Sequence, residues 1–113
     1  MSQGTRVRIG QLDKRVRLER FTATASKMGT QVKAWTAIGS RRANVSYGTG
    51  EERRRAAQTG ASVSATFRMR SDPTTRSLTP RDRLQFDDAE WDIVSAVPFG
   101  RRRFVDVTAT RAA

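Results

Sequence analysis

Residues 62–70 read Ser-Val-Ser-Ala-Thr-Phe-Arg-Met-Arg, a stretch in which apolar and polar side chains alternate without a break. The apolar set is Val63, Ala65, Phe67 and Met69. Because successive side chains of a β-strand point to opposite faces, a period of two is typical of a half-buried strand. This stretch predicts a strand with Phe67 in the core.

Shorter segments on both sides share that period. They are residues 15–21, 32–38 and 43–47 before this stretch, and 83–86, 90–97 and 104–110 after it, with expected turns at Gly39–Ser40, Asp87–Asp88 and 98–103. Trp91 is expected in the core beside Phe67. Short strands with turn signals at this spacing favour a mainly β fold, a small antiparallel barrel or sandwich of six to seven strands.

One helix is expected in the chain, at residues 51–58, Glu-Glu-Arg-Arg-Arg-Ala-Ala-Gln. Thr49 and Glu52 have the spacing of a capping box. The helix is about two turns long and has almost no apolar face, so its order must come from neighbours or from a partner. Residues 71–80, which contain two prolines, are expected to form a loop.

The chain has 113 residues, the length of one domain. We expect that domain over residues 9–113, with residues 1–8 as a basic arm that stays disordered unless a partner orders it. No apolar run is long enough for a signal-peptide core or a transmembrane helix, so the sequence favours a soluble, intracellular chain.

Composition argues against catalysis. The chain has no cysteine and no histidine, which removes the commonest nucleophiles, general bases and metal ligands. Asp87 and Asp88 are adjacent at an expected turn and do not form an opposed acid–base pair. The Gly48-x-Gly50 sequence lacks the rest of a nucleotide-binding fingerprint. We expect no enzyme activity, no cofactor and no metal.

Arginine dominates the charge. Lysine and arginine number 22 against 11 acidic residues, a net charge of +11 with an isoelectric point near 11.7. Such an excess suits a polyanionic partner, either nucleic acid or an acidic protein surface. The basic clusters are Arg41 and Arg42; Arg53, Arg54 and Arg55; and Arg101, Arg102 and Arg103. A solvated surface is the alternative for each cluster. Function is favoured for Arg53–Arg55, because their helix has little else to stabilise it.

Barrels that bind single strands or RNA need exposed aromatic side chains as stacking platforms. Most aromatic residues here have apolar neighbours two positions away, which is typical of a core. Trp35, which follows Lys33 and Ala34, is the best exposed candidate. A small basic barrel that binds nucleic acid on its own therefore stays open as an alternative function.

The order of several segments resembles a known family. They are Ile-Gly-Gln-Leu-Asp-Lys-Arg-Val at residues 9–16, Gly29 before Trp35, the predicted helix at 51–58, Thr-Pro-Arg-Asp-Arg-Leu at 79–84 and Trp-Asp-Ile-Val-Ser at 91–95. Together they resemble the head–tail joining family of tailed bacteriophages, also called head-closure or stopper proteins, from Ile9 to Thr110. Asp88-Ala89 stands where that family often has a turn with glycine.

The resemblance implies a β-barrel protein of a virion, made in the bacterial cytoplasm and assembled as a ring in the neck. The ring would lie between the portal with its adaptor and the tail or tail terminator, close the channel after DNA packaging and dock the tail. A gene transfer agent would use the same part. The adaptor and the tail terminator are themselves alternative identities. No membrane is implied.

The resemblance also implies roles for residues. The channel-facing element of the family corresponds to residues 47–62, which would place Arg53–Arg55 near packaged double-stranded DNA, held without regard to sequence. Glu51 and Glu52 could instead pair with these arginines in the adjacent subunit. Arg41, Arg42 and Arg101–Arg103 are candidates for contacts between subunits or with partners.

Overall fold

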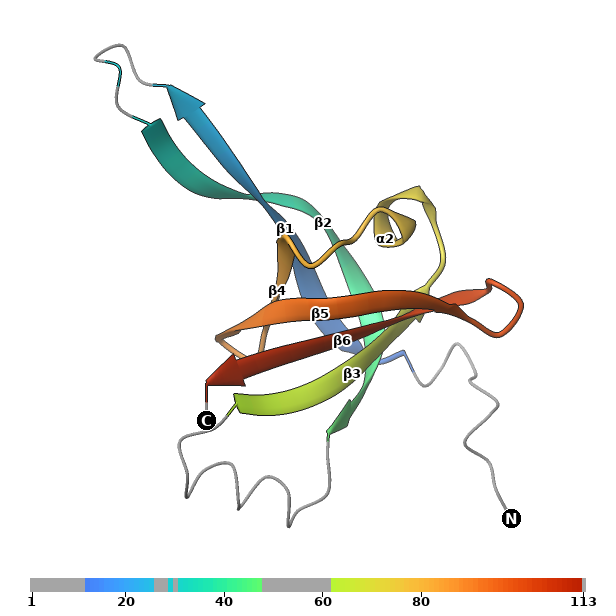
Figure 1. The fold of residues 1–113 in the computed structure, drawn as a ribbon. Coiled ribbons are helices and arrows are strands. Elements are labelled where there is room, and N and C mark those ends of the chain that lie inside the picture. The colour runs from blue at the N-terminus through green and yellow to red at the C-terminus, as the bar shows by residue number, and fades with distance from the viewer. Residues whose placement is uncertain (1–11, 26–28, 30, 48–61, 113) are drawn as a thin grey trace, which may run out of the picture.

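The computed structural model describes residues 12–25, 29, 31–47 and 62–112, where it shows six strands and one short helix. In chain order these are β1 (Lys14–Ala25), β2 (Gln31–Tyr47), β3 (Ser62–Arg70), α2 (Pro73–Arg76), β4 (Asp82–Phe86), β5 (Ala89–Phe99) and β6 (Phe104–Ala112). The strands close into one antiparallel barrel in the order β1-β2-β3-β6-β5-β4 (Figure 1). The predicted mainly β antiparallel barrel with one short helix is confirmed.

The barrel interior is filled by alternate residues of the strands, as the sequence period requires. Phe67 on β3 and Trp91 on β5 are almost fully buried, as predicted, and their rings meet edge to face with centroids 5.3 Å apart. Phe86 packs on Phe67 in the same geometry at 5.5 Å. Burying each large apolar side chain contributes about 1.5–3 kcal/mol, so this cluster holds one end of the barrel together.

The expected turn at Gly39–Ser40 is wrong. β2 continues through these residues as one strand of 17 residues. The pairing with β1 shifts by one residue between Leu18 and Glu19, opposite Gly39 and Ala37, and leaves Ile38 as the extra residue. Gly39 has φ +157°, and a side chain there would come within 2.8 Å of the Arg41 guanidinium. The glycine therefore marks a bulge that bends the strand, which a sequence pattern does not distinguish from a turn.

The helix is also not the predicted one. α2 lies inside the stretch expected to be a loop, while the predicted helix at residues 51–58 lies outside the described residues. The N–H of Thr75 donates to Asp72 Oδ1 at 2.8 Å, and the N–H of Asp72 donates to Thr75 Oγ1 at 2.9 Å. Pro73 occupies the first turn, where its missing N–H is no loss. Asp-Pro-Thr-Thr is thus a helix start rather than only a turn signal.

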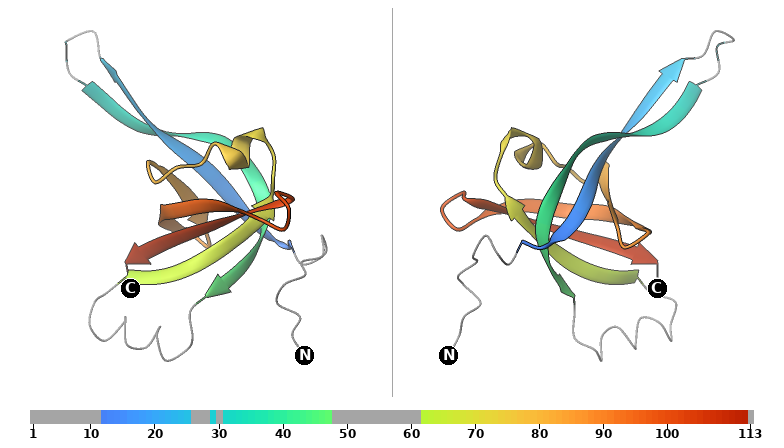
Figure 2. Two further views of the ribbon diagram at one scale, coloured as in Figure 1. Left: turned by 45° about the vertical axis from the view of Figure 1, so that its right-hand side comes forward. Right: turned by 180° about the vertical axis from the view of Figure 1, so that it is seen from behind.

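β1 and β2 continue past the barrel as a two-stranded arm, which we define as residues 21–25 of β1 and 31–35 of β2 (Figure 2). The ladder between β1 and β4 ends at Arg20 and Asp82, so within the described part of the chain the arm has no third strand. The molecule measures 61 × 38 × 20 Å, with a radius of gyration of 15.8 Å. A compact domain of this length has a radius of about 13 Å, so the arm makes the chain elongated.

Candidate functional site

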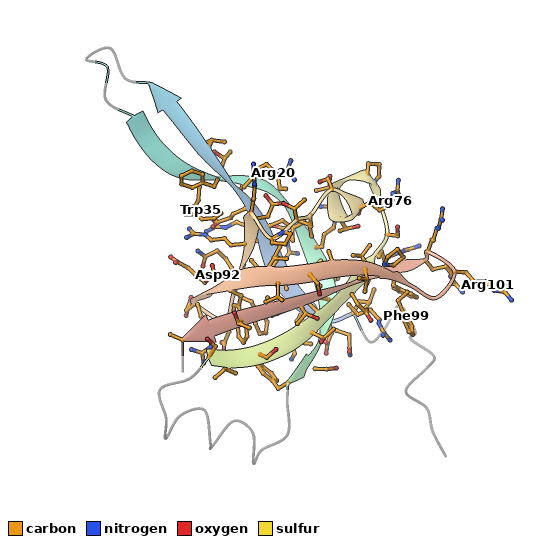
Figure 3. The ribbon with its side chains drawn as sticks, viewed as in Figure 1. Arg20, Trp35, Arg76, Asp92, Phe99 and Arg101 are labelled. Atoms are coloured by element: carbon orange, nitrogen blue, oxygen red, sulfur yellow. The ribbon has the colours of Figure 1, made fainter. Side chains whose placement is uncertain are left out.

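The turn between β5 and β6 carries Arg101, Arg102 and Arg103, all of them exposed as expected. Its backbone is fixed: the N–H of Arg103 donates to the Gly100 carbonyl at 3.1 Å, and the N–H of Ser71 donates to the Arg103 carbonyl at 2.9 Å. Arg101 and Arg102 have φ of 58° and 65°, a region that favours glycine, asparagine and aspartate. Figure 3 shows Arg101 projecting from this end of the barrel.

Arg41 and Arg42 point in different directions because they are neighbours on β2. Arg41 Nε donates to Asp72 Oδ2 at 2.8 Å, and Arg41 Nη1 donates to the Ser40 carbonyl at 2.7 Å. Arg41 therefore ties β2 to the start of α2. Arg42 is exposed and lies opposite Arg15 in the ladder with β1. Of this pair, Arg42 is the one that presents its side chain to solvent.

Asp72 is held as a carboxylate at the helix start. Partial burial would raise its pKa, but the hydrogen bonds from Arg41 and from the N–H groups of Thr75 and Thr74 outweigh that effect. The pKa of Asp72 is therefore lowered below its usual range. An ionised Asp72 fixes α2 and the adjoining Ser71 beneath the arginine turn.

The fold brings Arg41 and the arginine turn to the same end of the barrel, because Ser71 bonds to Arg103 and its neighbour Asp72 bonds to Arg41. Arg76 of α2 lies there too. A pocket of about 260 Å³ opens between α2 and β5, which we call the α2–β5 pocket. Its lining includes Ser71, Arg76, Ala96, Val97, Pro98 and Arg102.

Arg53–Arg55, with Glu51 and Glu52, lie outside the described residues. Their segment is attached at Tyr47 and Ser62. Ser62 pairs with Ala112, whereas Arg70 at the other end of β3 pairs with Phe104 beside the arginine turn. The segment that carries Arg53–Arg55 therefore joins β3 at Ser62, the end of the strand away from the arginine turn.

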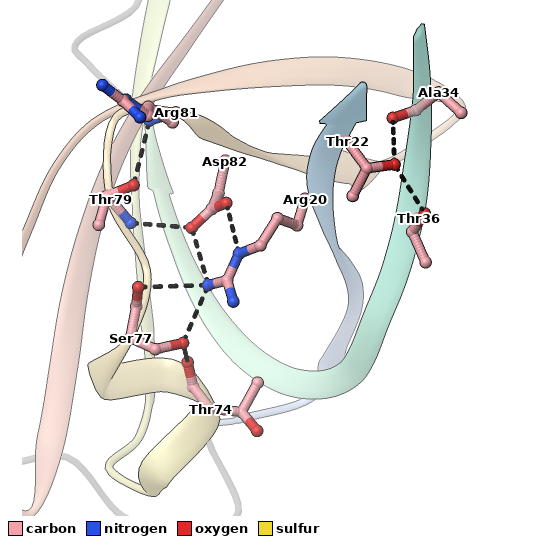
Figure 4. Close-up of polar contacts among 9 residues, drawn as sticks. All are labelled: Arg20, Thr22, Ala34, Thr36, Thr74, Ser77, Thr79, Arg81 and Asp82. Atoms are coloured by element: carbon pink, nitrogen blue, oxygen red, sulfur yellow. Dashed lines mark hydrogen bonds and ion pairs between the residues drawn. The ribbon is translucent and has the colours of Figure 1, made fainter. Parts of the chain in front are cut away.

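Ion pairs inside the described barrel use several carboxylates. Arg20 Nε donates to the buried Asp82 at 3.0 Å, and Arg20 Nη2 also reaches Ser77, as Figure 4 shows. The Asp82 contact raises the pKa of Arg20. Arg83 similarly holds the buried Glu19 at 2.6 Å.

Arg68 donates two hydrogen bonds to Asp106, from Nε to Oδ1 at 2.6 Å and from Nη2 to Oδ2 at 2.7 Å. These bonds raise the pKa of Arg68. The sequence analysis missed all three of these pairs, because each joins residues 38 to 64 positions apart. Only the strand order brings them together.

Trp35 is exposed, as the sequence suggested, with 36% of its surface accessible. Its ring meets Phe21 edge-on at 5.3 Å, and the Arg83 guanidinium lies 4.2 Å from the ring centroid. The stacked guanidinium covers one face of the ring. Trp35 is therefore part of a packed cluster at the root of the arm rather than an open stacking platform.

Among the residues that the structure describes, no three His, Cys, Asp or Glu side chains gather in a way that could hold a metal ion. No helix in that same part of the chain is long and apolar enough to cross a membrane. The features that remain are surfaces: the arginine turn, the α2–β5 pocket and the arm.

The family model of phage head completion proteins matches residues 7–112. The chain belongs to this family. It is therefore a structural protein that completes the head of a phage-type virion. The resemblance inferred from the segment order is confirmed, and so is the location in the particle.

Two solved structures share the fold of this family member. A chain in the virion of a native gene transfer agent particle is 23% identical, with a TM-score of 0.63, over 89% of this chain and 94% of that one. A protein from Shigella flexneri 2a, solved in solution, is 17% identical, with a TM-score of 0.63, over 91% and 95%. No curated protein sequence matches the chain.

Proposed function

We propose that this head completion protein forms a ring in the neck of the particle, between the portal with its adaptor and the tail, where it closes the DNA channel and docks the tail. The observation that carries the proposal is the family match over residues 7–112. The similar fold of a chain in a gene transfer agent virion supports the same setting.

The arm supports assembly into a ring. An isolated two-stranded hairpin is marginally stable in water and gains stability when a further surface covers it. At the root of the arm Phe21 and Trp35 are 40% and 36% exposed, and aromatic side chains are enriched at protein interfaces. A neighbouring subunit that covers these two side chains would bury apolar area and fix the arm.

We propose that Arg53–Arg55 contribute to channel closure by holding the packaged DNA. A ring repeats each arginine once per subunit, so the triplet would form a charged collar around packaged DNA. Contacts of guanidinium with phosphate ignore sequence and weaken with salt. Pairing of these arginines with Glu51 and Glu52 of the next subunit is the competing role.

A free nucleic-acid-binding barrel is less well supported. Trp35, its best stacking candidate, already packs against Phe21 and Arg83. Of the eight aromatic side chains in the described part of the chain, Phe67, Trp91 and Phe104 are buried in the core. The net charge alone supplies only non-specific attraction.

The experiment compares two triple substitutions that reverse the same number of charges. In one, Arg53, Arg54 and Arg55 become Glu; in the other, Arg101, Arg102 and Arg103 become Glu. If the first triplet holds DNA, heads with the first variant still join tails but lose their genome, and the loss grows with salt. With the second variant, assembly should fail at an earlier step, because the chain is not incorporated into the particle as a ring.

Two results would contradict the proposal that Arg53–Arg55 hold DNA. If the ring and the tail joint fail together in the first variant, these arginines instead form contacts between subunits. If particles with the first variant are fully infectious or transducing, these arginines are solvated and take no part. Purified particles that lack the chain altogether would refute the neck assignment itself.

A further inference from the structure

The α2–β5 pocket combines an apolar floor with a basic rim. The lining includes Ala96, Val97 and Pro98 of β5, which we call the apolar floor, and Arg76 of α2 and Arg102 of the turn, which we call the basic rim. At about 260 Å³ the pocket is smaller than a typical small-molecule site of roughly 300–1,000 Å³. It suits one or two side chains of another polypeptide.

Arg76 is oriented by a hydrogen bond, and neither rim arginine is neutralised by a carboxylate. Arg76 Nη1 donates to Ser71 Oγ at 3.1 Å, which turns its guanidinium along the rim. Neither Arg76 nor Arg102 has an ion pair with any carboxylate among residues 12–25, 31–47 and 62–112. The described Asp and Glu partners belong to other arginines, such as Arg41 and Arg20. The rim therefore favours an occupant that brings its own carboxylates.

The frame of the pocket is rigid. Asp72 and Thr75 lock the start of α2 through their reciprocal hydrogen bonds, and Arg41 anchors Asp72 to β2. The bond from Ser71 to Arg103 joins that frame to the arginine turn. A surface that is already ordered loses little conformational entropy on binding, which is the property of a docking site.

A complementary surface lies at the other end of β5 on the same chain. The turn between β4 and β5 consists of Asp87 and Asp88, both exposed, with φ of 56° at each. Neither has an ion pair within the described part of the chain, although Arg15 and Arg17 line a hollow beside the turn and Arg17 pairs with Glu19. Figure 3 shows the two ends of β5 facing opposite ways, marked by Asp92 and Arg101.

We infer that the α2–β5 pocket receives the Asp87–Asp88 turn of a second copy of this chain. The two carboxylates pair with Arg76 and Arg102. Because the two surfaces lie at opposite ends of β5, the contact is head-to-tail. A contact of this kind builds rings when the rotation between copies closes. The inference rests on the proposed ring and identifies the interface that would build it.

An acidic second copy explains the pocket better than DNA does. Phosphates would satisfy the rim arginines, but a sugar–phosphate backbone presents no apolar side chain to Val97 and Pro98. The turn supplies two carboxylates from a protein surface, and its geometry is preset, since aspartate tolerates positive φ.

Cross-linking tests the contact directly, because the chain has no cysteine of its own. Arg102→Cys and Asp88→Cys are combined in one chain, incorporated into particles and treated with a short bismaleimide. Denaturing gels should then show a ladder of covalent multimers that ends at the ring. Arg102→Cys with Asp13→Cys is the matched control, since Asp13 is exposed outside the turn. The control should give at least about tenfold less multimer.

A second variant separates assembly from folding. Asp87→Asn with Asp88→Asn removes both charges and keeps residues that tolerate the turn geometry. Incorporation into particles should fall about tenfold or more while the urea unfolding midpoint of the free chain stays unchanged.

Three results would overturn the inference: particles that contain the chain but give no ladder, cross-linking of Arg102→Cys to a cysteine of another protein instead, or normal incorporation of the Asn variant. In each of these the chain is still found in the neck, so the proposed ring survives and only this interface fails. Absence of the wild-type chain from particles would instead refute the proposed function.

Discussion

Phe67 and Trp91 show how far a single side chain can be understood from its neighbours in sequence. Both positions were predicted to be buried from period-two alternation alone, and both are. The hydrogen bond from Trp91 Nε1 to the Phe86 carbonyl, at 3.3 Å, satisfies the one polar atom that this burial includes. The pairing of Arg20 with Asp82 was not predictable in this way, because nothing local signals a partner 62 residues away.

Truncation of the core aromatics should therefore be costly. We expect Phe67→Ala and Trp91→Ala each to lower the free energy of unfolding by about 3–5 kcal/mol, measured by urea denaturation. Val94→Ala is the control, since Val94 is 53% exposed on the same strand as Trp91 and should change stability by less than about 0.5 kcal/mol. A loss below about 1 kcal/mol for either aromatic would mean that the inward face is wrongly assigned.

Asp72 gives a pH-dependent prediction. Its pKa is lowered in the folded chain, so its ionised form stabilises the fold above the unfolded pKa of about 4, and this contribution is lost as pH falls through the lower folded pKa. At pH 7, Asp72→Asn should cost about 0.5–1 kcal/mol, because the Arg41–Asp72 pair is partly exposed.

Denaturation at pH 7, 5 and 3 measures this difference between Asp72→Asn and wild type. The difference should hold between pH 7 and 5 and shrink toward pH 3. A difference that stays constant down to pH 3 would show that the charge of Asp72 contributes nothing and that only its capping geometry matters.

At the scale of elements, the sequence located strands better than their ends. Alternation identified β3, the β4–β5 hairpin and β6, but it divided β2 at Gly39, because glycine signals a turn and a bulge alike. It also missed α2, since two prolines outweighed the Asp72–Thr75 capping pair. The alternation stops at Phe21 and resumes at Val32, which predicts a long hairpin loop over residues 22–31, yet the pairing of β1 with β2 continues to Ala25 and Gln31. The extent of a hairpin depends on its register, which composition does not reveal.

The arm should be the least protected pair of strands in the free chain. Its amides belong to one ladder without a core beneath, whereas those of β3 lie between β2 and β6. We expect hydrogen exchange of residues 21–25 and 31–35 to be at least about a hundredfold faster than that of residues 65–69. In assembled particles the arm should gain protection. Equal rates in the free chain and in the particle would show that nothing covers it.

Shortening the arm tests its role separately from the barrel. Residues 22–34 are deleted, and Phe21 is joined to Trp35 through an Asn-Gly turn, which suits a two-residue hairpin. Because the core residues are untouched, the unfolding midpoint should fall only slightly, while incorporation into particles is lost. Normal incorporation of this variant would show that the arm does not contribute to assembly.

For the whole molecule, the balance of charges follows from the ion pairs. Four carboxylates each form an ion pair with an arginine of the same chain: Glu19, Asp72, Asp82 and Asp106. Much of the acidic charge is therefore neutralised within the molecule. The composition predicted a polyanionic partner, but only the structure separates arginines that hold the barrel, such as Arg68, from those that face outward, such as Arg101. The segment with Arg53–Arg55 stays a prediction, because it lies outside the described residues.

The free chain should therefore bind duplex DNA without sequence preference. If about three phosphates are neutralised, affinity should fall roughly 40-fold between 50 and 200 mM salt, since the logarithmic slope is about −0.9 per phosphate. Fluorescence anisotropy with two duplexes of permuted sequence measures both properties. A tenfold preference for one duplex, or affinity that ignores salt, would favour a sequence-reading protein over a neck component.

The barrel closes between its first and fourth strands, where Arg17–Arg20 of β1 pair with Asp82–Gln85 of β4. Across this seam, Glu19 and Arg83 are 64 residues apart. During synthesis β1 and β2 can pair as soon as they leave the ribosome, but β1 must then wait until most of the chain is made before the seam forms. Such long-range closure slows folding relative to a helical protein of equal size. Until then the hairpin has open edges that can join other strands. The yield of usable subunits therefore depends on how quickly each nascent chain finds its own β4, and we expect expression at lower temperature or slower synthesis to raise that yield.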